Sequence, residues 1–228
     1  GPRTTPGAVF GRARPMGELD AVFSAQEARR VSPVFAQPAK ATIYKNDATI
    51  GQRAMRIRDL IRRGSRDPAV RKLAGAVLAK RAPDKPGGWT VAEKDWRGEA
   101  EALFHAVRRN VRYTRDHRDA DTYVHPARTL YDNVLGSGGI GDCDDMAITL
   151  GALLLAVGHD MSLRIVAVKQ GGAETPSWNH IYLVDRLPSG GAIAGPGGDV
   201  MALDASVDRP PGWEAPKNRI YKQRDIKV

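Results

Sequence analysis

Apolar residues recur at helical spacing in the first half of the chain, where arginines separate them. One amphipathic helix is indicated by positions three and four residues apart, namely Ile50, Ala54, Ile57, Leu60 and Ile61. Asp67 and Pro68 supply an N-cap and a proline at the first helical position, which predicts a second helix towards Arg81. A Pro- and Gly-rich break at 82–88 follows, and a third helix is expected from about Val91.

The second half of the chain changes to longer apolar runs. From Cys143 to about Val157 apolar side chains cover most of the helical circumference, which predicts a buried central helix. Gly158 is expected to end this helix as a C′ glycine. Three short runs rich in β-branched and aromatic residues then predict strands, at Leu163–Lys169, Trp178–Asp185 and Asp199–Ala205.

Composition limits the architecture to one sizeable core. The chain has 228 residues, of which 42% are hydrophobic. No apolar run approaches the roughly 18 to 20 residues that cross a bilayer, so no transmembrane segment is expected. Residues 1–45 are rich in Gly, Pro, Ala and Arg and predict an extended or disordered arm, with a short helix around Glu18–Arg30.

Positive charge is concentrated in the first half of the chain. Residues 1–116 hold 24 Lys and Arg against 12 Asp and Glu, whereas residues 117–228 hold 11 against 14. The first half is suited to an acidic protein, nucleic acid or an anionic membrane, although a solvated helix surface is the more ordinary explanation. Aromatic residues are not interleaved with the basic ones, so a stacking platform for single-stranded nucleic acid is not indicated.

The chain has one cysteine, which excludes an intramolecular disulfide and a zinc site built on several thiolates. Cys143 is expected at a helix N-terminus, with Asp142 as the N-cap. Free N–H groups at that position favour a thiolate and can stabilise an oxyanion as it forms. The glycine-rich approach, which ends at Gly141, leaves room for a substrate backbone.

A base for this thiol is available in the predicted strands. If the last two strands pair antiparallel about a loop centred near Ala192, His180 lies directly opposite Asp204, and Asp185 lies opposite Asp199. Opposed side chains are close enough for an imidazole–carboxylate hydrogen bond. Cysteine, histidine and aspartate then have the roles of nucleophile, base and orienting group.

The residues that carry this pattern resemble the transglutaminase-like superfamily, and most of all the bacterial transglutaminase-like cysteine proteinases. The similarity covers about residues 95–207 and rests on Gly141-Asp142-Cys143-Asp144-Asp145-Met146-Ala147 together with the three strands. It implies a papain-like α+β core, in which the cysteine helix packs on an antiparallel sheet, preceded by a helical N-terminal region. It also implies attack on an amide or peptide bond by Cys143, His180 and Asp204.

The aspartates beside the thiol oppose its ionisation, because nearby negative charge raises a thiol pKa. An imidazolium at His180 could compensate, or calcium could, since calcium favours several oxygen ligands. In the proteinases that this chain resembles, the flanking acids take part in calcium binding, which makes Asp142 and Asp144 candidate ligands. Alternatively, Asp142 only caps the helix while Asp144 and Asp145 complement its dipole.

The leading hypothesis is a cysteine hydrolase or acyl-transferase that acts on a protein or peptide substrate. Trp178 lines the substrate cleft or packs in the core, and both roles stay open. The expected segments are an arm at 1–45, a helical region at 46–92, a catalytic domain at 93–208 and a loosely packed tail at 209–228. The alternative is a structural or assembly protein, for example in a phage virion, that binds partners through its basic half; a bacterial periplasmic location also stays open.

Overall fold

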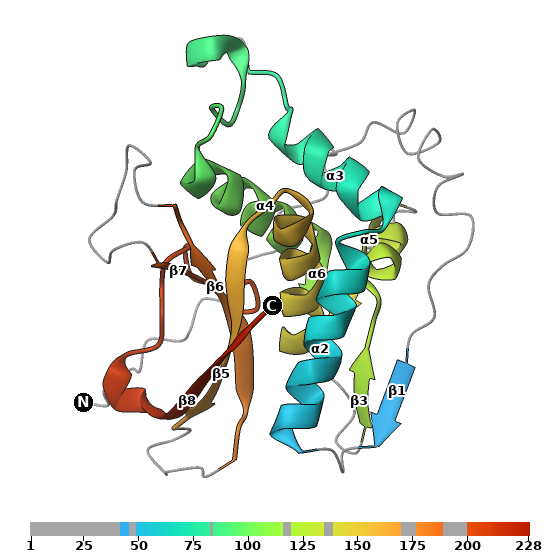
Figure 1. Cartoon of the computed structure of the whole chain (residues 1–228), viewed down its shortest axis with the longest axis vertical. Helices are drawn as coiled ribbons and strands as arrows, with labels where there is room; N and C mark the ends of the chain where they lie inside the picture. Colours follow the sequence, from blue (N-terminus) through green and yellow to red (C-terminus); the bar gives the residue numbers. More distant parts are fainter. Residues whose placement is uncertain are drawn as a thin grey trace, which may run out of the picture.

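The cysteine-bearing helix lies at the centre of the molecule. The computed structural model describes residues 42–45, 49–82, 84–115, 120–134, 139–169, 177–188 and 200–228. Figure 1 shows α6 (Cys143–Ala156) between a four-stranded sheet and helix α2. Because apolar side chains surround α6, every residue from Asp145 to Leu154 is buried. The predicted central helix is therefore confirmed, and it ends before Gly158, which has φ +99°.

Four helices pack against α6: α2 (Ile50–Gly64), α3 (Pro68–Leu78), α4 (Trp96–Asn110) and α5 (Pro126–Val134). Gly151 allows α2 to approach closely, since a Cβ there would lie 2.9 Å from Cδ1 of Ile61. The predicted cap of α3 is confirmed, because the Asp67 carboxylate accepts the Ala69 N–H at 2.8 Å. Helix α4 begins later than predicted, at Trp96, since Asp95 caps it there.

The sheet contains four antiparallel strands in the order β7–β6–β5–β8. Their bounds are β5 Asp160–Val168, β6 His180–Arg186, β7 Val200–Leu203 and β8 Ile220–Lys227. Alternate side chains, among them Leu163, Leu183 and Leu203, join the core cluster that contains α6. The intervening positions form a second, smaller cluster, which consists of Val166, Tyr182, Val184 and Ala202.

The register of β6 against β7 differs from the predicted one by two residues. Leu183 faces Leu203, and Asp185 faces Met201 instead of Asp199, which lies outside the described residues. The symmetric hairpin was wrong because the length of the connection does not fix where pairing begins. A shift of two residues preserves the face on which each side chain lies, so His180 and Asp204 stay on one face.

The segment at 209–228 is not a loose tail over its whole length. Its last part forms β8, which pairs with β5 along seven residues of that strand, from Ser162↔Lys227 to Val168↔Ile220. Most β8 side chains are exposed, as expected of a charged edge strand, and this polar composition concealed the strand in the sequence. Ile226 and Val228 pack against the main core.

Two small sheets complete the described structure. Strand β1 (Thr42–Lys45) pairs antiparallel with β3 (Ala120–Tyr123), and β2 (Val111–Tyr113) pairs parallel with β4 (Gly139–Gly141). Short 3₁₀ turns occur at Pro86–Gly88 and Lys217–Arg219.

Helices together with an antiparallel sheet confirm the predicted α+β class. No helix among the described residues is long and apolar enough to cross a membrane. Apart from strand β1, the predicted arm with its helix around Glu18–Arg30 lies outside the described residues.

Candidate active site

Cys143 is the first residue of α6, where the sequence places it. The predicted N-cap is confirmed, because Oδ1 of Asp142 accepts the N–H groups of Asp144 at 2.9 Å and Asp145 at 3.4 Å. These bonds leave the Cys143 N–H without a partner in the described part of the chain. Gly141 has no room for a side chain, since a Cβ there would lie 2.5 Å from Cβ of Asp145.

The thiol of Cys143 is half-buried and lies among carboxylates. Its Sγ is 3.6 Å from Oδ1 of Asp144. Burial raises the pKa of this thiol well above its ordinary value, and Asp144 and then Asp142 raise it further. The backbone N–H of Ile181 donates a hydrogen bond to the sulfur and opposes this rise in pKa. The thiol is therefore protonated at neutral pH, in spite of its place at a helix N-terminus.

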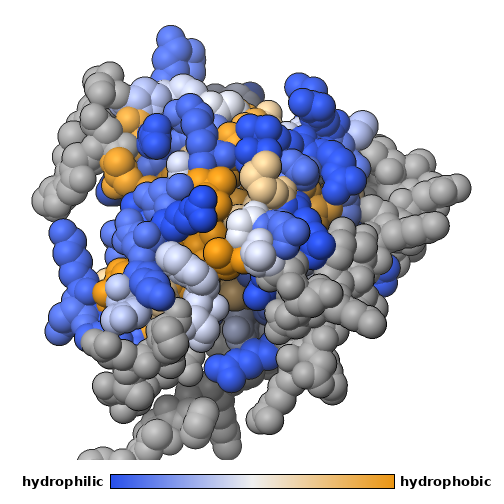
Figure 2. All heavy atoms as spheres, turned by 60° about the horizontal axis from the view of Figure 1, so that its bottom comes forward, coloured by the Kyte–Doolittle hydropathy of each residue, from blue (hydrophilic) through white to orange (hydrophobic). Residues whose placement is uncertain are grey.

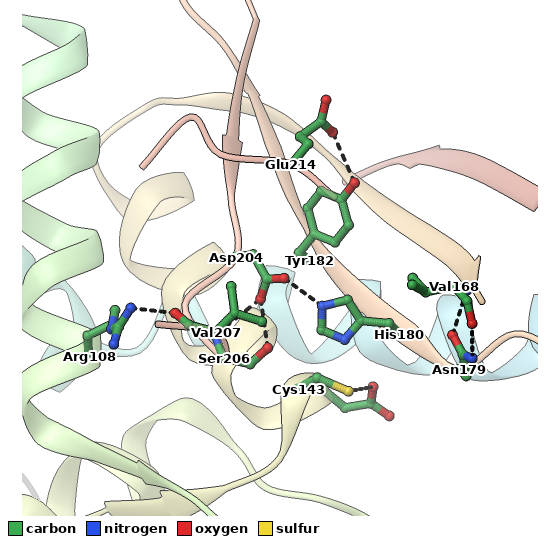
Figure 3. Close-up of polar contacts among 11 residues, drawn as sticks. Arg108, Cys143, Val168, Asn179, His180, Tyr182, Asp204, Ser206, Val207 and Glu214 are labelled. Atoms are coloured by element: carbon green, nitrogen blue, oxygen red, sulfur yellow. Dashed lines mark hydrogen bonds and ion pairs between the residues drawn. The ribbon is translucent and has the colours of Figure 1, made fainter. Parts of the chain in front are cut away.

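His180 and Asp204 form a direct pair. Nε2 of His180 is 2.6 Å from Oδ2 of Asp204, and the carboxylate is almost fully buried. The other carboxylate oxygen, Oδ1, accepts the Ser206 hydroxyl at 2.6 Å and the Ser206 N–H at 3.2 Å. Both oxygens of Asp204 are thus held, which fixes the direction in which it presents Oδ2 to the ring (Figure 3).

The imidazole lies beside the thiol but is not bonded to it. Ile181, whose N–H reaches Sγ, directly follows His180 in β6. Figure 3 shows Nδ1 of His180 on the side of the ring that faces Cys143. Within the described residues Nδ1 has no hydrogen-bond partner, and Sγ has its contact with Asp144 instead. The structure thus brings the three predicted residues together, with the Asp–His bond formed and the His–Cys bond open.

Three further residues support this site and were missed in the sequence. Arg53 of α2 lies 3.9 Å from Oδ2 of Asp144 and brings a cation to the acidic flank. Arg108 of α4 binds the Val207 carbonyl and, at 2.8 Å, the Asp208 carboxylate, so it holds the chain just after Asp204. Local sequence gives no signal for either arginine. The third residue is Ser206, which binds Asp204; their spacing is typical of an Asx turn and could have been recognised in the sequence.

Trp178 and Asn179 precede the histidine strand. The Trp178 side chain is partly buried and packs against the main core, so it has a packing role. Asn179 exchanges two 2.9 Å hydrogen bonds with the backbone of Val168 in β5. It therefore fixes the start of β6 and does not orient the His180 ring.

The described residues offer few ligands for a calcium ion. Asp142, Cys143 and Asp144 each bring one ligand atom within 4.8 Å of the others. Calcium prefers about six to eight oxygen ligands, whereas this group offers two carboxylates and a thiol. One carboxylate caps α6 and the other lies beside Arg53. Calcium at Asp142 and Asp144 therefore stays a prediction, and no chemical step below depends on it.

The surface next to the thiol includes apolar groups. Ile140 of β4 is 51% exposed and Tyr113 of β2 is 45% exposed, and Tyr113 pairs with Gly141 just before the cysteine. Burial raises the pKa of the Tyr113 phenol, and the charge that Cys143 would carry as a thiolate adds to the rise. Figure 2 shows the face that is obtained when the bottom of Figure 1 is turned forward, where hydrophilic side chains surround an apolar region.

Comparison with known proteins leaves the family open. No family model matches the chain, and no curated protein matches it. Among solved structures, a Parabacteroides distasonis protein described as a "putative protease" has a TM-score of 0.37 and 15% identity over 68% of this chain. The match spans 29% of that protein, less than a third of its length. Values this low say nothing about the activity of this chain.

Proposed function

We propose that this protein is a cysteine hydrolase or acyl-transferase of transglutaminase-like type, with a papain-like core, that acts on an amide bond of a protein or peptide. One observation carries the proposal. His180, which lies 2.6 Å from Asp204, is the first residue of β6, and the N–H of the next residue, Ile181, donates a hydrogen bond to the Cys143 sulfur. Nucleophile, base and orienting carboxylate thus converge from α6, from β6 and from the residue after β7, as cysteine hydrolysis requires.

The first step is attack of sulfur on the amide carbonyl. Because burial and carboxylates raise the thiol pKa, Cys143 is protonated at rest, and Nδ1 of His180 removes its proton as the bond to carbon forms. The free N–H of Cys143 donates to the oxyanion of the tetrahedral intermediate. Binding of substrate has to bring Nδ1 and Sγ into hydrogen-bond range, since such bonds often tighten only in the substrate complex.

The second step is collapse of this intermediate. The carbon–nitrogen bond breaks, the His180 imidazolium gives its proton to the leaving amine, and a thioester remains on Cys143. Water then attacks the thioester while His180 takes its proton, which releases the acid and returns the thiol. An amine in place of water would give a new amide, so hydrolysis and transamidation differ only in the acceptor. Asp204 holds the ring through Nε2 and stabilises the imidazolium in both steps.

Alkylation by iodoacetamide tests the proposal without a known substrate. The protein has one cysteine, so every modification reports on Cys143. At pH 7, His180→Ala should slow labelling by about tenfold or more if His180 removes the proton. His105→Ala is the matched control, because His105 is an exposed residue of α4 whose ring contact is with Phe104, and the substitution should leave the rate unchanged. Equal rates for wild type and His180→Ala would refute a catalytic role for the pair.

A second candidate is assembly through the basic half, and one observation favours it. Five basic side chains on α2, on α3 and between them are exposed and have no ion pair in the described part of the chain: Arg62, Arg63, Arg66, Arg71 and Lys72. They form a surface suited to an anionic partner. This role is compatible with a catalytic site and requires its own test, described in the Discussion.

A further inference from the structure

A second polar cluster lies at the end of α6 opposite the cysteine. Nδ1 of His159 is 2.6 Å from Oδ2 of Asp185, and its Nε2 is 3.4 Å from Oε2 of Glu99. Trp96 packs edge-on against the imidazole, with ring centroids 5.2 Å apart. The cluster joins three elements, since Glu99 and Trp96 belong to α4, Asp185 to β6, and His159 to the turn after α6.

Stability alone does not explain this cluster. The His159 and Asp185 side chains are 1% and 0% exposed, and Oδ1 of Asp185 has no hydrogen-bond partner among the described residues. A buried polar pair often stabilises a fold no more than apolar residues of similar volume would. What such a pair can add is a defined register between the elements that carry it.

The two partners are fixed to the elements that carry the proposed nucleophile and base. The His159 N–H donates to the Leu154 carbonyl at 3.1 Å, which ties His159 to the last turn of α6. Cys143 is the first residue of the same helix. Asp185 lies five residues after His180 in β6 and pairs with Met161 of β5. The same helix and strand therefore meet twice, once at each end.

We propose that His159 and Asp185 are positioning residues, which fix α6 against β6 and thereby set Cys143 relative to His180; this inference rests on the proposed function. Between the Ile181–Cys143 hydrogen bond at one end and this pair at the other, the side chains of α6 and β6 meet through apolar groups, and apolar contacts are not directional, so they allow small sliding movements. A hydrogen bond restricts both distance and angle. Because a misplacement of about 1 Å can slow a reaction by about 100-fold, a fixed register has a direct effect on rate.

The test measures the iodoacetamide rate at pH 7 in variants that remove the pair without leaving a buried charge. The principal variant is His159→Leu combined with Asp185→Leu, made in the wild type and in the His180→Ala background. Thr149→Val is the control, because Thr149 is also a buried polar residue of α6 but contacts neither partner. A second pair of variants is more conservative. The amide nitrogen of His159→Asn can replace Nδ1, whereas that of His159→Gln replaces Nε2 and loses the Asp185 contact.

If the inference holds, the double-leucine variant and His159→Gln slow labelling by about tenfold, and only when His180 is present. His159→Asn and Thr149→Val should stay close to wild type. A slower rate in both backgrounds, or an unchanged rate in the double-leucine variant, overturns the positioning role. Should the double-leucine variant not fold, His159→Asn and His159→Gln decide the question. Only His159→Gln should then slow labelling, and only when His180 is present. If His180→Ala alone has no effect, the proposed function fails first, and the inference fails with it.

Discussion

Replacing Asp144 by Asn should make Cys143 more reactive, although Asp144 lies within the candidate active site. The contact between Sγ and Oδ1 of Asp144 is 3.6 Å long. At that distance the repulsion between a thiolate and a carboxylate is about 1 kcal/mol in water and about 4–5 kcal/mol at an effective dielectric constant of about 20. Asp144→Asn should therefore lower the thiol pKa, and since about 1.4 kcal/mol is a tenfold change in an equilibrium constant, the small thiolate fraction at neutral pH should rise about tenfold or more.

The effect on rate is smaller than the change in pKa suggests. Well below the pKa, the thiolate fraction rises about tenfold for each unit by which the pKa falls. The intrinsic nucleophilicity of the thiolate falls at the same time, with a Brønsted coefficient of about 0.4–0.5. The net gain is therefore about threefold for each unit, and alkylation at pH 7 should be faster by about threefold or more in Asp144→Asn.

The assay is the iodoacetamide rate measured from pH 5 to pH 10, which follows how the reactivity of the thiol rises as its proton is lost. Asp59→Asn is the control, since Asp59 is an exposed acid of α2 whose partner is the neighbouring Arg58. Its profile should match that of wild type. An unchanged pH–rate profile in Asp144→Asn would show that the carboxylate does not govern the thiol. A slower rate across the profile would show instead that Asp144 itself assists removal of the proton.

Four other outcomes are expected. Because the pKa of Cys143 is raised in the folded state, that state binds more protons than the unfolded state above about pH 8.5. The free energy of unfolding should therefore fall with rising pH, and more steeply in wild type than in Cys143→Ala. Asp204→Asn should slow alkylation by about tenfold or more at pH 7, since the ring loses its anionic partner. If calcium binds at Asp142 and Asp144, it should raise the melting temperature and EGTA should reverse the rise, and an unchanged melting temperature would refute that prediction. Arg62→Gln with Arg66→Gln should weaken salt-sensitive binding of DNA or polyglutamate, whereas wild type that binds neither would refute an assembly role for this surface.

The local features of the site could be predicted because short-range chemistry determines them. Asp142 caps α6 since its side chain meets N–H groups only two and three residues ahead. The contact between His180 and Asp204 was anticipated from an incorrect register. It survived because an error of two residues leaves both side chains on one face of the sheet, where a diagonal neighbour is still within reach.

The features that were missed depend on contacts between segments far apart in the chain. Arg53 reaches Asp144 from a helix 91 residues earlier, and nothing in the arginine-rich pattern distinguishes it from its neighbours. His159 meets Asp185 across the turn after α6 and two strands, although Asp185 looked like an ordinary strand-end residue. Packing of α6 on the sheet selects these partners, and one sequence does not report which side chains that packing brings together.

The three aspartates around Cys143 have different contacts at the N-terminus of α6. Asp142 occupies the N–H groups that would otherwise stabilise a thiolate, and Asp144 places its own charge beside the sulfur. Asp145 is buried and accepts the Val124 N–H at 2.8 Å, so it serves the fold. The sulfur therefore stays protonated until a base removes its proton, and Nδ1 of His180 is the free nitrogen beside it. Reactivity then depends on how closely α6 and β6 approach each other, more than on the helix dipole.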